Sequence, residues 1–263
     1  MPMRNLSLAA AIVAASLWAS AAQAAVAPVQ LISNGSFSEG VNGFASWTIR
    51  EQPGSAGAWA LQTGPFSNVT GLPVPLPPNQ AAMIDPFGPY SGVLFQAFTI
   101  PSFGVPIASA KFSVTLYLAN YAEDFFAPSS TDYRFDQVGA NQQFWIRLGR
   151  GLAQSPDVGL DETLLSIYQT EPGDNRLFSN YTPIVIDLDP AMLDPLQGKR
   201  LGVGIGLTSN LIYFVAGITG IEFAVQPIPE PSVLVLVLVS GALLGLRVGL
   251  RRRSRTVPEP GVL

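Results

Sequence analysis

The chain has 263 residues, of which 48% are hydrophobic and only 12% are charged. Average soluble proteins carry about 25% charged residues, and disordered chains are poor in apolar residues, so this composition excludes intrinsic disorder. Cysteine and histidine are both absent. Disulfides, Cys/His zinc sites and catalysis through an imidazole are therefore excluded.

The charges are unevenly distributed along the chain. Residues 25–226 contain 8 of the 14 basic and 16 of the 18 acidic residues, which gives this part a formal charge of −8. A surface of that sign repels phosphate backbones, so we expect no binding of nucleic acid. The 25 glycines and 23 prolines indicate a chain rich in turns.

Residues 1–25 have the three parts of a secretory signal peptide. Arg4 gives the positive start, residues 6–18 are apolar, and Ala22 and Ala24 form a small-x-small site for signal peptidase. An apolar stretch of this length is shorter than the roughly 20 residues that span a bilayer. We therefore expect this segment to be cleaved rather than kept as an anchor.

The C-terminal region predicts a membrane span. Pro229, Glu230 and Pro231 are followed by an apolar stretch over 232–250 (SVLVLVLVSGALLGLRVGL). As a helix it would be about 28 Å long, enough to cross the hydrocarbon core. The basic residues after it hold that end in the cytoplasm by the positive-inside rule and place the rest of the chain outside; they are Arg251, Arg252, Arg253 and Arg255.

This order of tripeptide, spanning helix and arginine cluster resembles the PEP-CTERM sorting signal of Gram-negative bacteria that make extracellular polysaccharide. The resemblance implies that 227–255 is a sorting signal and that a membrane exosortase cuts near the tripeptide. The protein would then be anchored transiently in the inner membrane before it reaches the cell surface or the extracellular space. Residues 256–263 form a further tail. A membrane anchor that is never cut is the alternative.

The part between the two ends, residues 26–226, is predicted to form one all-β domain. Short alternating or apolar runs recur, broken by Gly, Pro, Asn and Asp, and helical periodicity is scarce. Such runs favour an antiparallel β-sandwich. The predicted strands are 45–49, 58–61, 80–84, 92–100, 110–119, 143–148, 162–168, 182–188, 200–207 and 211–225.

Two stretches are predicted loops, and one a short helical turn. Residues 66–79, counted together with Pro65 just before them, hold five prolines and are incompatible with a central strand. Residues 120–141 carry acidic side chains with aromatic residues between them. The turn is predicted over 189–196, where Asp189 and Pro190 are typical of a helix start.

Several segments, in order, resemble galactose-binding-like jelly rolls. The opening LISNGSFSEG over 31–40, with Trp47 after it, is similar to the start of these domains. NQQFWI over 141–146, YTPIVIDL over 181–188 and GITGI over 217–221 are similar to later strands. The resemblance implies a jelly-roll sandwich.

Domains of this family often hold a structural Ca²⁺ with a carboxylate from the first motif and an Asp from the last strand. Here the corresponding residues are Ser38, with Glu39 after it, and Thr219-Gly220. Calcium prefers six to eight oxygen ligands, usually with several carboxylates. The two replacements argue against a calcium site, and no cofactor is predicted.

The residues suited to ligand binding gather in the 120–141 loop and on the strand after it. Sugars stack on aromatic faces and exchange hydrogen bonds with nearby carboxylates and amides. The candidates are Tyr121, Asp124, Tyr133, Asp136 and Trp145. The alternative is that the loop rings pin the loop to the sandwich and that Trp145 packs beneath it.

Three functions remain open from the sequence. The favoured one is a non-catalytic, exported surface protein that binds extracellular polysaccharide. The second is a structural matrix protein without a defined ligand. The third is a carbohydrate-active enzyme, which needs two carboxyl groups about 5–10 Å apart; Asp132 with Asp136, or Glu123 with Asp124, are the candidate pairs.

Overall fold

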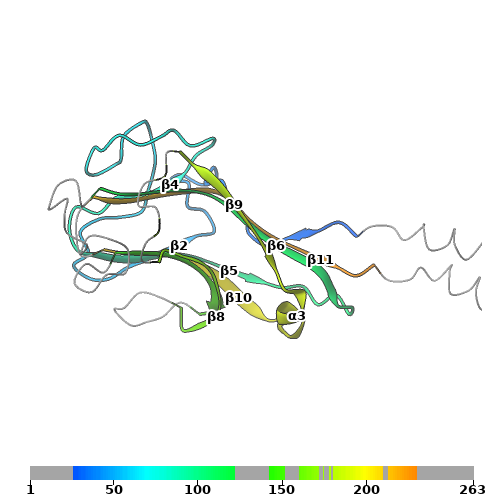
Figure 1. Ribbon diagram of the computed structural model, residues 1–263. Coiled ribbons are helices and arrows are strands. Elements are labelled where there is room, and N and C mark those ends of the chain that lie inside the picture. Colours follow the sequence, from blue (N-terminus) through cyan, green and yellow to red (C-terminus); the bar gives the residue numbers. More distant parts are fainter. Residues whose placement is uncertain are drawn as a thin grey trace, which may run out of the picture. The chain divides into compact units, whose positions relative to one another are not determined.

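Two antiparallel β-sheets form the body of the protein (Figure 1). The computed structural model describes residues 26–121, 142–151, 160–171, 174, 178, 180–209 and 213–229. Within these residues the strands are β1 (Val29–Gln30), β2 (Thr48–Glu51), β3 (Ala60–Leu61), β4 (Ala82–Ile84), β5 (Tyr90–Thr99), β6 (Ile107–Asn120), β7 (Gln143–Arg150), β8 (Glu162–Gln169), β9 (Thr182–Leu188), β10 (Arg200–Ser209) and β11 (Phe214–Pro227).

The strand order is that of a jelly roll. One sheet runs β3-β4-β11-β6-β9, with β1 also paired to β11, and the other runs β2-β5-β10-β7-β8. The pairs are nested: β4 with β11, β5 with β10, β6 with β9 and β7 with β8. This is the pattern of one long hairpin rolled up into two facing sheets, the double-sheet arrangement of jelly rolls. The predicted all-β antiparallel sandwich is therefore confirmed, with this topology.

The main core lies between the two sheets and follows the two-residue alternation of the strands. On β6 the inward side chains are those of Phe112, Val114, Leu116 and Leu118, and on β7 those of Phe144, Ile146 and Leu148; all belong to one buried cluster. Each such side chain contributes about 1.5–3 kcal/mol when fully buried.

A second apolar cluster lies on the opposite face of the β6–β11–β4 sheet. Tyr117 on β6, Val215 on β11 and Met83 on β4 are buried there, together with Val74 from the segment between β3 and β4. That segment, residues 62–79, is called the proline-rich loop below. Its apolar side chains cover this part of the sheet, so the loop is packed against the sandwich.

All ten predicted strands are found, with ends that differ by a few residues. β9 has the predicted bounds, whereas β6 and β7 are longer than predicted, and the two-residue β1 was not predicted. The predicted turn is also confirmed as α3 (Pro190–Leu193) followed by a 3₁₀ turn (Asp194–Leu196). Asp189 caps α3 by accepting a hydrogen bond from Ala191 N at 2.9 Å, as its position before Pro190 indicates.

The predictions for the two chain ends fall outside the described residues. These are the signal peptide over 1–25, including Ala22 and Ala24, and the segment from Glu230 onward with Pro231, the apolar stretch and the four arginines. In the part of the chain that is described, no helix has the length and apolar character needed to cross a membrane.

Candidate functional site

The chain segment that includes the proline-rich loop contains no charged residue. From Gln52 to Ile84 the chain contains no Asp, Glu, Lys or Arg, a run of 33 residues. A run of this kind was visible in the sequence but did not enter the prediction of a site. The charged residues that bound it are Glu51 and Asp85.

The tip of the proline-rich loop is a small hairpin held by its own backbone and hydroxyl groups. Ser67 N donates to Leu72 O at 2.8 Å, and Leu72 N donates to Ser67 Oγ at 2.8 Å. Val74 N donates to Pro65 O at 3.0 Å, beside the bridge between Phe66 and Pro73. The five prolines restrict φ in the segment, so little conformational entropy remains to be lost when it orders.

Asp85 fixes this tip to the end of β4. Its side chain is 1% exposed, and its Oδ2 accepts hydrogen bonds from Val69 N at 3.2 Å, Thr70 N at 2.7 Å and Thr70 Oγ1 at 2.9 Å. A buried carboxyl group is costly unless it is hydrogen-bonded. Asp85 is therefore satisfied inside the loop and does not present its charge at the surface.

Gln62 holds the base of the same loop. Its Nε2 donates to Gly64 O and to Pro75 O, both at 2.8 Å, and its Oε1 accepts from the Tyr181 hydroxyl at 2.5 Å. Tyr181 lies beside the Tyr117 ring, with centroids 5.6 Å apart. Burial raises the pKa of Tyr181 above its usual value, so the phenol stays a donor to Gln62. The loop is thus fixed at both its tip and its base.

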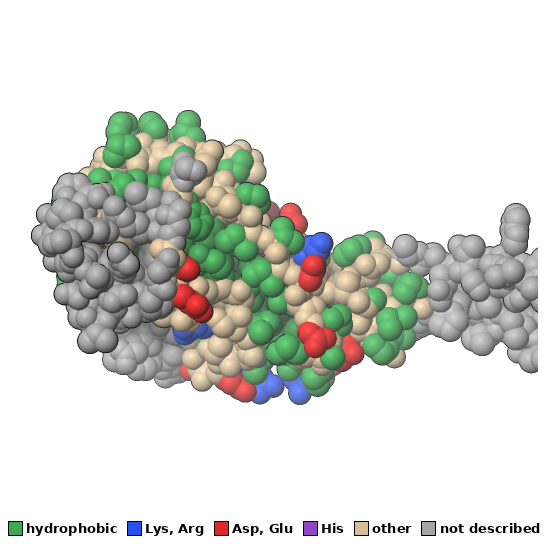
Figure 2. Space-filling model, in the orientation of Figure 1, with side chains coloured by type: hydrophobic (Ala, Val, Ile, Leu, Met, Phe, Trp, Pro, Cys, Tyr) green, Lys and Arg blue, Asp and Glu red, His purple; other side chains and the backbone are tan. Residues whose placement is uncertain are grey.

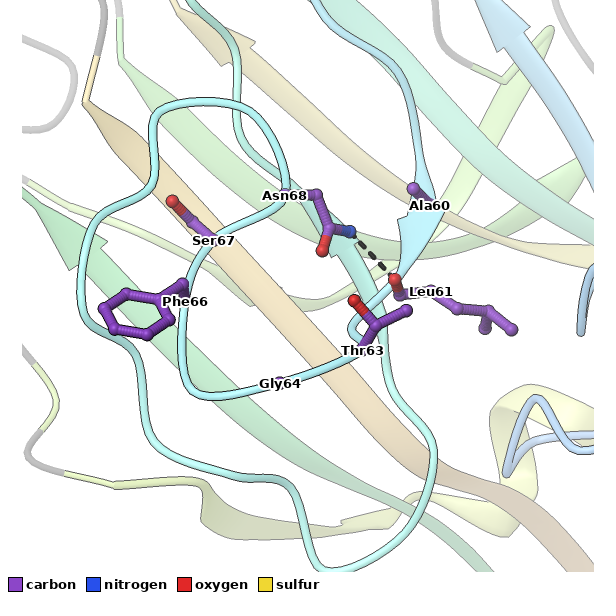
Figure 3. A pocket seen from close by; sticks show the side chains of 7 residues that line it. All are labelled: Ala60, Leu61, Thr63, Gly64, Phe66, Ser67 and Asn68. Atoms are coloured by element: carbon purple, nitrogen blue, oxygen red, sulfur yellow. Dashed lines mark hydrogen bonds between the residues drawn. The ribbon is translucent and has the colours of Figure 1, made fainter.

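A shallow hollow of about 390 Å³ opens beside this loop (Figure 3). Phe66, which is 57% exposed, stands at its edge with the ring directed away from the Thr63 and Asn68 side chains, which supply a hydroxyl and an amide on the other side of the loop backbone (Figure 3). Asn68 Nδ2 donates to Leu61 O at 2.9 Å, which holds the amide in place. The full lining is Ala60, Leu61, Thr63, Gly64, Phe66, Ser67 and Asn68.

Exposed apolar side chains lie on the proline-rich loop and on the turn after Asp85. Phe66, Val69 and Leu76 from the proline-rich loop are 57%, 44% and 64% exposed, and Phe87 from the turn after Asp85 is 61% exposed. Figure 2 shows hydrophobic and uncharged side chains standing out at the upper left of the molecule, where Figure 1 places the cyan loop, with charged side chains elsewhere on this face.

Of the five ligand candidates predicted from the sequence, the structure describes Tyr121 and Trp145. Tyr121 is half-buried just after β6; its hydroxyl lies 3.1 Å from that of Tyr117 and donates to Pro73 O at 3.4 Å. Its ring therefore lies against the proline-rich loop. The other candidates, Asp124, Tyr133 and Asp136, are outside the described residues, as are the carboxylate pairs suggested for catalysis.

Trp145 is not an open platform for a sugar. Its side chain lies on the outer face of β7, as predicted, but is only 3% exposed. The indole covers Gly206 on β10, where an added Cβ would lie 2.2 Å from Trp145 Cε2, and the Arg147 guanidinium carbon lies 4.6 Å from the ring centroid. The indole is packed between β10 and the Arg147 guanidinium, so the prediction that Trp145 stacks on a sugar is wrong.

Asn34 organises the turn of the opening motif. Asn34 Nδ2 donates to Gly43 O and Ala45 O, both at 2.9 Å, and lies 3.5 Å from Glu39 O, while Oδ1 accepts from Glu39 N at 3.0 Å. The amide nitrogen stands where these carbonyl oxygens converge and closes the turn through them. Thr219 Oγ1, at the other expected ligand position, donates to Gln80 O. No group of three or more acidic residues suited to a metal occurs among the described residues.

Three other acidic residues make contacts within the sandwich. Asp187 faces Lys111 across β6 and β9 at 3.6 Å, Asp189 caps α3, and Glu162 pairs with Arg150 at 3.0 Å. Exposed pairs of this kind contribute little to stability. Of the proposed sorting tripeptide, Pro229 is described and half-buried.

Comparison with protein-family models finds no match, and comparison with curated protein sequences finds none either. Among solved structures, the chain is similar to an adhesin domain of Lys-gingipain from Porphyromonas gingivalis (10% identity, 75% of this chain and 99% of that one, TM-score 0.44). It is also similar to a CBM22-1 xylan-binding domain from Paenibacillus barcinonensis (13%, 78% and 99%, TM-score 0.38). It spans 21% of the tailspike protein 4 enzymatically active domain of bacteriophage CBA120 (12% identity, 75% of this chain, TM-score 0.39). Scores of this size establish neither common fold nor common function, and the jelly-roll assignment rests on the strand order.

Proposed function

We propose that this chain is an exported, exosortase-sorted surface protein that binds extracellular polysaccharide without catalysis. The export and sorting part of the proposal rests on the signal-peptide pattern and on the order of tripeptide, apolar stretch and arginine cluster. Its partners during export are signal peptidase and an exosortase in the inner membrane. Its final location is the cell surface or the extracellular space, and its jelly roll belongs to the galactose-binding-like group.

The observation that carries the binding part is the exposed Phe66 ring at the rim of a hollow that also offers an amide and a hydroxyl group. Aromatic faces cover the C–H surface of a sugar ring, while Asn and Thr side chains exchange hydrogen bonds with its hydroxyls. The loop is fixed by Asp85 and Gln62. A preorganised surface loses less entropy when it binds, which favours affinity.

Tyr121, directly after β6, adjoins the proposed surface. The Tyr121 hydroxyl reaches Pro73 O, so the start of the 120–141 segment adjoins the proline-rich loop. We include Tyr121, Asp124, Tyr133 and Asp136 in the proposal as further ligand groups. Trp145 is left out because its ring is covered.

The test is co-sedimentation of the purified full chain, in a mild detergent, with the extracellular polysaccharide of its own host. We expect saturable binding that Phe66→Ala weakens at least tenfold. Leu76→Ala is the control for a general loss of exposed apolar surface on the same loop. Absence of saturable binding by a chain with a normal thermal transition would refute the proposal.

A structural role in the matrix is the second candidate, and the edge strand β9 favours it. Val185 in the middle of β9 is 56% exposed, and among the described strands only β6 pairs with β9. An exposed edge can pair with a strand from another copy, although Pro183 and Asp187 oppose this. Concentration-dependent association that Val185→Lys abolishes, together with no binding of polysaccharide, would favour this role.

The sorting proposal has a separate test. Replacement of Pro229, Glu230 and Pro231 by alanine is expected to leave the full-length form in the inner membrane. The wild-type chain should appear outside as a shorter species. A mature species of the same size and location in both cases would remove the exosortase from the account.

A further inference from the structure

We infer that the hollow beside the proline-rich loop takes an uncharged polysaccharide, and that anionic chains are excluded from it. This inference rests on the proposed function and names the class of ligand. It follows from the distribution of charge around the hollow, which the polysaccharide-binding proposal does not use.

No residue that lines the hollow carries a charge. The whole run from Gln52 to Ile84 is free of ionisable acidic and basic side chains, and Asp85 is 1% exposed with its carboxyl group hydrogen-bonded to Val69 and Thr70. Among the described residues, the hollow therefore offers neither a cation to pair with a carboxylate nor an exposed anion to pair with an amine.

A carboxylate that entered such a site would lose hydration without gaining a charged partner, which is unfavourable. The wider field adds to this cost, because residues 25–226 carry a formal charge of −8. Long-range repulsion between surfaces of one sign slows the approach of an anionic chain at low salt. A neutral chain meets neither barrier.

The groups that are present suit a neutral sugar. Phe66 supplies an aromatic surface for C–H groups, and the Asn68 amide and the Thr63 hydroxyl are neutral partners for sugar hydroxyls. Binding through such groups does not depend on ionic strength, in contrast to binding through ion pairs.

The experiment uses the host's extracellular polysaccharide, separated by anion exchange into a neutral and an acidic fraction. Part of the acidic fraction is also chemically reduced at its carboxyl groups. The full chain is titrated with each sample between about 20 and 500 mM NaCl, where the screening length falls from roughly 20 to 4 Å. We expect saturable binding to the neutral fraction that changes less than twofold across this range. Phe66→Ala should weaken it at least tenfold.

A charge introduced at the rim provides a matched pair of variants. Asn68→Lys should gain salt-sensitive affinity for the acidic fraction, whereas Asn68→Gln, similar in length but neutral, should not. Carboxyl reduction of the acidic fraction should remove the gain.

The outcomes separate this inference from the proposed function. Wild-type binding to the acidic fraction alone, weakened by salt, would overturn the neutral-ligand inference and leave polysaccharide binding standing. Binding to no fraction by a chain that unfolds normally would overturn both. Binding to the neutral fraction that Phe66→Ala does not affect would overturn the assignment to this hollow.

Discussion

Replacement of Asp85 by alanine tests whether one buried carboxyl group orders the proposed binding loop. Asp85 Oδ2 accepts hydrogen bonds from the backbone nitrogens of Val69 and Thr70 and from the Thr70 hydroxyl, at 3.2, 2.7 and 2.9 Å. Asp85→Ala removes these three contacts and also the contact of the Thr70 hydroxyl with Oδ1 at 3.0 Å. It leaves the two backbone donors at the loop tip without their partner.

The magnitude follows from these contacts. A hydrogen bond to a charged group contributes about 1.5–3 kcal/mol, and water replaces part of it where the donor is partly exposed. Counting the two backbone bonds and discounting for solvent, we expect the free energy of unfolding to fall by about 3 kcal/mol. Asp85→Asn keeps one acceptor oxygen of nearly the same shape and should cost roughly half as much.

Two measurements check the reasoning about Asp85. Denaturant unfolding of the full chain gives the change in stability, and hydrogen exchange reports on the amides of Val69 and Thr70 directly. We expect both amides to exchange much faster in Asp85→Ala than in the wild type, and affinity for polysaccharide to fall with them. Unchanged exchange at these two amides would refute the role given to Asp85, whatever the total stability.

Three further predictions concern the sandwich itself. Gly206→Ala should lower the free energy of unfolding by about 1–3 kcal/mol and change the Trp145 environment in near-ultraviolet circular dichroism, because the new Cβ overlaps the indole; Gly64→Ala, with open space around it, should change neither. Asn34→Ala should lower the free energy of unfolding by about 2–4 kcal/mol in the same assay, because its hydrogen bonds to partly buried backbone groups are lost. Neither Ca²⁺ nor a chelator should shift the unfolding temperature of the wild-type chain. Burial, with a smaller effect of Asp174, raises the pKa of Tyr168 to about 12. The contribution of Tyr168 to stability is therefore fully present below pH 10, where the unfolded phenol begins to ionise, and is lost as the pH rises toward 12. In an alkaline titration followed by absorbance at 295 nm, the tyrosines with raised pKa should ionise only when the protein unfolds. These are Tyr90, Tyr117, Tyr168 and Tyr181. Reversible titration of every tyrosine near pH 10 in the folded protein would contradict this.

The strands were predictable because their pattern is local. The alternation from Phe112 to Leu118 directs every second side chain into the core, and the structure buries those residues between the sheets. The start of α3 was equally local, since Asp189 before Pro190 supplies both a cap and a fixed φ. Short β1 lacks enough residues for such a pattern.

The environment of Trp145 was not predictable from its own strand. Its ring is buried because Gly206 lies directly opposite it on β10 and leaves room for the indole. Gly202, Gly204 and Gly206 occur at every second position, so the sequence predicts that one face of this strand has no side chains there. It does not show which strand pairs with it. Long-range pairing of this kind decides burial, and periodicity alone does not supply it.

The candidate site was missed for a related reason. The prolines correctly predicted that residues 65–79 are not a central strand. A loop of this composition has no hydrophobic periodicity, so the sequence does not show which of its side chains are buried. Val74 and Leu72 pack on the sheet while Phe66 and Leu76 remain exposed. Which of these side chains are buried depends on how the loop is held, by Asp85 at its tip and by Gln62 at its base.

The most direct test of the account is a hydrogen-exchange footprint of the full chain with and without the neutral fraction of its host's polysaccharide. We predict that the ligand protects residues 62–79, together with the turn around Phe87, and that this protection disappears in Phe66→Ala. Protection confined to residues 120–141 or to the β9 edge, with none on the proline-rich loop, would contradict the central claim.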